Sequence, residues 1–271
     1  MLPFITYKIN DQIYQIKDPM GVLTTLIIGK NNAMLIDTGY GIFNLKEYIK
    51  SITTKDLIVM NSHGHMDHTG GNYLFNEIYI HQKDEELVKL HNSINWRKRN
   101  IKSAKNLNLI DESFDEEAYL NKREGNLKYL NIHDIFDLGD LTIEIINLEG
   151  HTQGSVGFLI KELNILVTSD AICPFVWIFL KESTTFKVYK EMLKNTLNLN
   201  FDYFLVGHGA GKLLPKSRME KFYQTALDLT IEKSVKVEFN NFDDANSYCY
   251  TKGKMYDQED SGIVFDPNRM E

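Results

Sequence analysis

Cysteine is scarce in this sequence of 271 residues, which contains only Cys173 and Cys249. The two do not form a CxxC pair, and a chain of this length buries roughly 70–75% of its unfolded surface without covalent cross-links. Because disulfides are rare in reducing compartments, we expect two reduced, buried thiols in a cytoplasmic protein.

Long apolar runs and an excess of basic residues are also missing. The longest apolar run, Ala171–Leu180, has ten residues, whereas a membrane-spanning helix needs about 20. Residues 1–10 show no basic region followed by an apolar stretch, so we expect no secretion signal. Thirty Lys and Arg against 37 Asp and Glu give a net charge of −7. The sequence therefore predicts neither a membrane nor a nucleic-acid partner.

The composition is that of a globular protein, with 43% hydrophobic and 25% charged residues. Short runs rich in Ile, Val and Leu indicate strands, most of them buried on both faces. Apolar residues at helical spacing between these runs indicate helices, and the alternation predicts an α/β fold. The predicted strands are 22–28, Ala33–Ile36, Leu57–Met60, Leu141–Leu148, Ile165–Val167 and Tyr203–Val206, with helices near 45–52, 186–196 and after Pro215. In the last helix, Ser217 and Glu220 have the spacing of a capping box.

Residues 83–125 are mostly polar, with a basic block from Arg97 to Lys105 and an acidic block from Asp111 to Glu117. We predict that they form an insertion of two or three helices within a single domain spanning residues 1–271. The charge blocks are typical of a solvated helical surface, with steering of a substrate as the alternative. Residues 236–271 indicate short strands and turns packed on the body.

A histidine or an aspartate follows each of five predicted strands at its carboxyl end. These positions are Asp37, the segment 63–68, His151, Asp170 and His208. In open α/β sheets ligands bind outside the carboxyl ends of strands, so we expect these side chains to share one site. The remaining His81, His91 and His133 match no motif, and we interpret them as structural or exposed.

The residue types at these strand ends favour a metal site. His63 and His65 are two residues apart in an extended segment, so both imidazoles point to one side. Imidazole and carboxylate ligands without thiolate suit zinc, and also iron or manganese. Five histidines with Asp67 and Asp170 are too many ligands for one ion and about right for two ions that share a carboxylate.

These segments resemble the metallo-β-lactamase superfamily of metal-dependent hydrolases. The matching motifs, in the family's order, are Asp37-Thr38-Gly39, His63-Gly64-His65-Met66-Asp67-His68 (the HxHxDH signature), Gly150-His151-Thr152, Ser169-Asp170 and Gly207-His208-Gly209. The resemblance covers residues 20–210 approximately. It implies a four-layer αβ/βα sandwich with the metals at one edge.

The resemblance also implies a role for each motif residue. The implied ligands are His63, His65 and His151 for one metal, and Asp67, His68 and His208 for a second, with Asp170 bridging the two. Asp37 is expected to support the ligand loops through hydrogen bonds, as ligand loops generally require. We expect two divalent ions, zinc above all, with iron or manganese as alternatives.

Two such ions about 3.5–4 Å apart can hold a water and lower its pKa towards ~7. The metal-bridging hydroxide is expected to attack a carbonyl carbon, with Asp67 orienting the water and shuttling its proton. We therefore predict a hydrolase of a small-molecule ester, lactone or thioester. The alternatives are a phosphodiesterase with the same two metals and a mononuclear iron sulfur dioxygenase. A bridging Asp170 argues against β-lactamase activity, because the zinc β-lactamases that the sequence resembles lack such an aspartate.

The only residues that indicate a substrate pocket in the sequence are aromatic. Phe175 and Trp177 follow Asp170 closely, and aromatic density beside a metal site is typical of an acyl-binding wall. Core packing or a subunit interface would give the same pattern, so a homodimer stays an alternative. The insertion is a candidate lid, in which Trp96 and Arg97 would reach an anionic group of the substrate.

Overall fold

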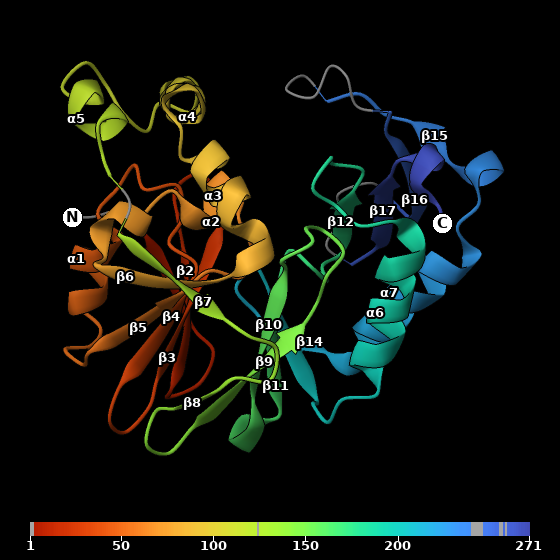
Figure 1. Cartoon of the computed structure of the whole chain (residues 1–271), viewed down its shortest axis with the longest axis horizontal. Helices are drawn as coiled ribbons and strands as arrows, with labels where there is room; N and C mark the ends of the chain where they lie inside the picture. Colours follow the sequence, from red (N-terminus) through yellow and green to blue (C-terminus); the bar gives the residue numbers. More distant parts are fainter. Residues whose placement is uncertain (1–2, 124, 240–245, 255–256, 258) are drawn as a thin grey trace.

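The computed structural model describes residues 3–123, 125–239, 246–254, 257 and 259–271. Within these residues, two large sheets face each other and helices cover both outer sides (Figure 1). One sheet has seven strands in the order β1-β2-β3-β4-β5-β6-β7, and the other has six in the order β14-β13-β11-β10-β9-β8. This helix, sheet, sheet, helix layering confirms the predicted α/β fold class.

The elements have the following bounds. The seven-stranded sheet contains β1 (Ile5–Lys8), β2 (Ile13–Lys17), β3 (Leu23–Ile28), β4 (Ala33–Ile36), β5 (Leu57–Met60), β6 (Glu77–His81) and β7 (Asn126–Leu130). The six-stranded sheet contains β8 (Ile135–Asp137), β9 (Thr142–Asn147), β10 (Val156–Ile160), β11 (Ile165–Ser169), β13 (Tyr203–Val206) and β14 (Leu214–Pro215). The α-helices are α1 (Leu45–Lys50), α2 (Met66–Thr69), α3 (Glu85–His91), α4 (Ile94–Asn106), α5 (Glu116–Leu120), α6 (Phe186–Leu197) and α7 (Lys216–Asp228).

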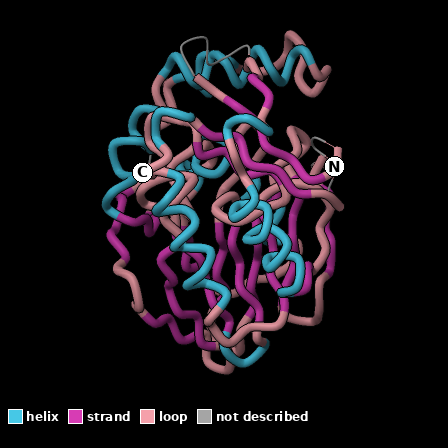
Figure 2. The backbone as a smooth tube through the Cα atoms, turned by 90° about the vertical axis from the view of Figure 1, so that its right-hand side faces the viewer, coloured by secondary structure: helices cyan, strands magenta, loops and turns pink. Residues whose placement is uncertain are grey.

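Three apolar layers hold the sandwich together. Between the sheets, Ile36 and Met60 from one side belong to the same buried cluster as Phe158 and Val167 from the other. Helix α1 packs on the outer face of the first sheet, and α6 and α7 pack on the outer face of the second. Figure 2, which views the molecule from the side of α6 and α7, shows helices in front of the strands. Burial of these apolar faces is the main favourable term in folding, so it fixes the relative positions of the two sheets.

A third, four-stranded sheet was not anticipated. It combines β12 (Phe175–Ile178) with β17 (Ser261–Phe265), β16 (Tyr248–Lys252) and β15 (Val235–Lys236). Short strands were expected for residues 236–271, but their pairing with β12 was not. Positions 240–245, 255–256 and 258 of that prediction lie outside the described residues.

Two further predictions concern helices. Residues 83–125 contain α3, α4 and α5, as predicted. The capping box at Ser217 is wrong, because α7 begins after Pro215, which fixes the helix start without a side-chain cap. In the part of the chain that the structure describes, no helix is long and apolar enough to cross a membrane.

Candidate metal centre

The register of two parallel strand pairs brings the predicted ligands to one edge. Strands β4 and β5 align Ile36 with Met60, so Asp37 and the 61–68 segment leave the sheet together. Strands β11 and β13 align Ser169 with Val206, so Asp170 and His208 also leave together. Because the two sheets face each other, both pairs of loops converge on the same space, as the strand-end pattern predicted.

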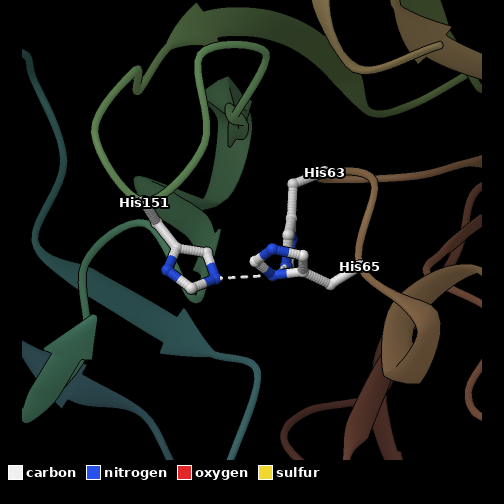
Figure 3. A group of neighbouring side chains, drawn as sticks. All are labelled: His63, His65 and His151. Carbon is white, nitrogen blue, oxygen red and sulfur yellow. Dashed lines mark hydrogen bonds between the residues drawn. The ribbon is translucent and has the colours of Figure 1, made fainter. Parts of the chain in front are cut away.

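The first set of side chains, the three-histidine group, consists of His63, His65 and His151. Figure 3 shows the three rings turned toward one another from two separate loops. The Nδ1 atom of His65 lies 3.1 Å from Nε2 of His63 and 2.9 Å from Nε2 of His151. All three rings are buried, and the group could hold a metal ion.

Each ring of this group has one nitrogen facing the other rings and one facing away. The hydrogen bonds of the nitrogens that face away show whether the inward-facing nitrogens are protonated. Nδ1 of His151 donates to the carbonyl oxygen of Trp177 at 2.6 Å, because a carbonyl can only accept. Nε2 of His65 donates to Oε1 of Glu182 at 2.8 Å. In the neutral rings the inner Nε2 of His151 and Nδ1 of His65 therefore both carry lone pairs, and these cannot bond to each other. A cation between them satisfies both.

The spacing of this group agrees with a tetrahedral ion. Zinc–nitrogen bonds of ~2.0–2.1 Å in tetrahedral geometry separate two ligand nitrogens by roughly 3.3 Å. The observed separations of 3.1 and 2.9 Å are close to that value. The donor chemistry and the geometry of the three-histidine group thus both fit a zinc-like ion.

The second set, the mixed group, consists of Asp67, His68, Asp170 and His208. Nε2 of His208 lies 3.2 Å from Oδ2 of Asp67 and 3.2 Å from Oδ2 of Asp170. Nε2 of His68 lies 3.4 Å from the same two oxygens and is buried without a hydrogen-bond partner among the described residues. Oδ1 of Asp170 is buried and unpartnered in the same sense. Orphaned polar atoms are costly when buried, and a bound cation would satisfy both.

The two groups differ in protonation. Burial, followed by the charge of His65, lowers the pKa of His151 to about 4. Burial and then His68 also hold the pKa of His63 well below its usual value. For His208, desolvation lowers the pKa, but Asp170 and Asp67 outweigh it and raise the pKa to about 10. At neutral pH His63 and His151 are therefore unprotonated and ready to bind a cation, whereas His208 must first lose a proton.

Asp37 lies behind the mixed group, as the sequence predicted. Its carboxylate accepts hydrogen bonds from the backbone and hydroxyl of Ser62, both at 2.8 Å, and from Nδ1 of His68 at 2.8 Å. The hydroxyl of Ser169 donates to it at 3.0 Å. Both Asp37 and Ser169 adopt positive φ, at 68° and 47°. Such backbone is held only where the surroundings over-determine it, and these four hydrogen bonds do so.

Asp84 ties the two histidine loops together, and sequence analysis missed it. Its buried carboxylate accepts from the backbone of Gly64 at 2.8 Å, from the hydroxyl of Thr152 at 2.6 Å and from the backbone of Gly154 at 2.8 Å. The loop between His63 and His65 is thereby joined to the loop after His151. Asp84 follows β6 and lies in no recognised motif, so no sequence signal pointed to it.

Gly207 shows how closely the mixed group is packed. A Cβ atom at this position would meet Oδ1 of Asp170 at 2.3 Å and Cε1 of His68 at 2.9 Å. Any side chain there would displace the mixed group. Position 207 therefore requires glycine, because the backbone lies directly against Asp170 and His68.

A cavity of about 490 Å³ opens above the two groups. Both predicted pocket residues, Phe175 and Trp177, line it, together with Tyr40 and Leu180. Cys173 also lines it and is only partly buried, unlike Cys249, and neither cysteine forms a disulfide within the described residues. The cavity therefore joins the candidate metal centre to an aromatic wall.

Two further cavity residues, Glu182 and His91, were missed. Glu182 is the acceptor for His65, and its pKa is about 2 because hydrogen bonding and charge from His65 outweigh the upward effect of burial. His91, interpreted as structural or exposed, is buried against His65, with ring centroids 5.1 Å apart. Neither residue lies in a motif, and His91 comes from the insertion.

Arg97 does not reach the site, so the predicted role for it is wrong. Its side chain is 1% exposed, donates to Asn92 and lies over the rings of Tyr73 and Tyr119. Trp96 lines the cavity as expected, and Arg99 lies there in place of Arg97. Arg97 and Arg99 are two residues apart on a polar helix, and the pattern of charges does not show which of them faces the cavity.

A family model agrees with the fold and with the two candidate ligand groups. The model for the metallo-beta-lactamase superfamily matches residues 18–208. The chain belongs to this superfamily.

Named relatives are distant. An acyl-coenzyme A thioesterase of Homo sapiens, MBLAC2, is 22% identical over 162 residues, covering 54% of this chain and 57% of its own length. A "probable metallo-hydrolase" of Methanocaldococcus jannaschii is 31% identical over 203 residues, covering 68% of this chain and 85% of its own length. A solved metallo-beta-lactamase from Pontibacter korlensis has a TM-score of 0.57 at 15% identity, covering 83% of this chain and 100% of its own. At 15% identity, this likeness is evidence for a shared fold and not for a shared activity.

Removing the Glu182 acceptor should weaken ion binding by the three-histidine group. In Glu182→Ala the outer N–H of His65 loses its partner, and we expect zinc affinity to fall roughly 10–100-fold. Glu182→Gln keeps an acceptor and should lose less, while exposed Glu191→Ala should change nothing. Competition with a chromophoric chelator measures the affinity, and unchanged binding by Glu182→Ala would contradict this role.

Ion binding should release more protons from the mixed group than from the three-histidine group. A pH of 7.5 is below the pKa of His208, about 10, so His208 holds a proton. The same pH is above the pKa of His151, about 4, so His151 is already neutral. Filling the mixed group should therefore release protons, and its affinity should fall about tenfold per displaced proton for each pH unit lost. Calorimetric titration in buffers of different ionisation enthalpy measures the release; equal release from both binding steps would refute the assignment.

Proposed function

We propose that this chain is a dinuclear metal-dependent hydrolase that cleaves a small-molecule carboxylic ester, lactone or thioester. The observation that carries the proposal is the meeting of the three-histidine group and the mixed group at the floor of one cavity. Asp170 is suited to serve both groups, because Oδ2 faces His68 and His208 while Oδ1 is buried and unpartnered among the described residues. We assign His63, His65 and His151 to one ion and the mixed group to the other.

The chemistry that two bound ions supply is activation of a water and polarisation of the scissile carbonyl. The protein contributes position and proton transfer. Asp67 lines the cavity beside His208, so we assign to its carboxylate the orientation of the attacking water and the transfer of its proton to the leaving atom. Asp37, Asp84 and Glu182 hold the ligand loops in register through buried hydrogen bonds.

The substrate class follows from the walls of the cavity. Phe175, Trp177 and Leu180 give the cavity an apolar wall, which suits the acyl part of an ester or thioester. A relative described as an acyl-coenzyme A thioesterase supports the thioester. A phosphodiesterase would use the same ions but not this wall. A mononuclear iron sulfur dioxygenase would leave one of the two complete ligand groups without a purpose.

Metal content and turnover test the proposal together. We expect about two ions per chain, hydrolysis of a panel of esters, lactones and thioesters, and much slower turnover of bis(p-nitrophenyl) phosphate. Asp170→Ala should lose an ion and all turnover, while Asp56→Ala, an exposed change at the opposite end of β5, should lose neither. One iron with oxygen consumption would establish the dioxygenase instead, and preferred turnover of the phosphodiester would establish the phosphodiesterase.

Chain-length dependence tests the aromatic wall. Each buried methylene contributes about 0.8 kcal/mol, so kcat/KM should rise up to ~4-fold per methylene across a short acyl series. Phe175→Ala and Trp177→Ala should flatten this rise, because the apolar contact is lost. Tyr203→Ala, at an exposed position in β13 outside the cavity lining, is the control. The same slope in all four proteins would show that the acyl group binds elsewhere.

A further inference from the structure

One cationic side chain of the insertion lies in the cavity wall without an anionic partner. Arg99 of α4 lines the cavity, and no described carboxylate lies within 4.0 Å of its guanidinium. The other cations of α4 do not line the cavity: Arg97 is buried on two tyrosines and Lys105 pairs with Glu116, while Lys98 and Lys102 are exposed. Arg99 is exposed to solvent at this wall, so in a chain of net charge −7 its charge is free to attract an anionic group that enters the cavity.

The guanidinium is held by a column of planar groups that leads to the metal centre. Arg99 lies 4.7 Å from the ring of Trp96, whose ring is 4.0 Å from His91 at an interplanar angle of 24°. His91 in turn stacks on His65, at 5.1 Å and 22°. The backbone N–H of Met66 donates to Nδ1 of His91, which fixes the far end of the column to the ligand loop. This stacking positions Arg99 relative to His65 of the three-histidine group.

We propose that Arg99 is a specificity residue that binds an anionic group, phosphate or carboxylate, on the leaving part of the substrate. The inference rests on the proposed function. A planar guanidinium pairs with either oxyanion in bidentate geometry, which an ammonium cannot match. Ser103, one turn along α4, lines the same cavity and adds a hydroxyl donor.

The two walls explain why the anion belongs to the leaving part. Helix α4 lies on the N-terminal half of the molecule and β12 on the C-terminal half (Figure 1), and both contribute to the cavity. The apolar β12 wall, with Phe175 and Trp177, suits the acyl part. A bond cleaved at the floor between these walls leaves the acyl product on β12 and an anionic thiol or alcohol on α4.

Binding of uncleavable thioethers tests this without turnover. The chain has two tryptophans, Trp96 and Trp177, so a Trp177→Phe background leaves Trp96 beside Arg99 as the sole reporter. We would titrate S-butyl-coenzyme A, S-butylglutathione and neutral S-butyl-N-acetylcysteamine and follow Trp96 fluorescence. Arg99→Gln should raise the Kd of an anionic probe roughly tenfold or more and leave that of the neutral probe unchanged.

Matched variants decide the interpretation. Lys98→Gln removes the same charge from an exposed position outside the cavity lining and should leave all Kd values unchanged; Arg99→Lys should fall between wild type and Arg99→Gln. If Arg99→Gln raises the Kd of S-butyl-coenzyme A alone, the bound anionic group is a phosphate. If it raises the Kd of S-butylglutathione alone, the group is a carboxylate. Equal weakening of all three probes, equal effects of Lys98→Gln, or no effect of Arg99→Gln would overturn the inference. Arg99-dependent binding in a protein that hydrolyses no acyl substrate would refute the proposed function and keep the anion site.

Discussion

The outward hydrogen bonds of the site histidines are the interaction on which the rest depends. His151 donates to a backbone carbonyl, His65 to Glu182 and His68 to Asp37, and each bond turns the other nitrogen of the ring inward. The protein thus gathers imidazole nitrogens and carboxylates in one small volume, an arrangement that a bound cation would stabilise. The orientation of these candidate ligands is set by hydrogen-bond partners that lie behind them.

Two buried carboxylates make this arrangement possible. Asp37 gathers Ser62, His68 and Ser169 behind the mixed group, and Asp84 joins the two loops of the three-histidine group. Both accept three or more hydrogen bonds, which offsets the cost of burying a charge. They also bridge segments from both sheets, so the metal centre and the packing of the sandwich support each other.

The walls above the metal centre come from parts of the chain that lie outside the two central sheets. Strand β12 belongs to the small third sheet, and α4 belongs to the insertion between β6 and β7. The superfamily's motifs supply a common floor, while these additions form the surface a substrate meets first. This division separates the candidate ligands, which lie in the motifs, from the cavity walls, which lie outside them.

The sequence by itself determined the fold class and singled out seven candidate ligands that the structure brings together, because apolar strands and the polar residues at their ends are local patterns. It also pointed to Phe175 and Trp177. Only the tertiary structure decided which other side chains meet the ligands: Asp84, His91 and Glu182 lie in no motif and arrive from separate elements. It likewise decided that Arg99 and not Arg97 faces the cavity. A polar helix has no apolar periodicity to fix its rotation, so its orientation depends on which distant tyrosines bury one of its arginines.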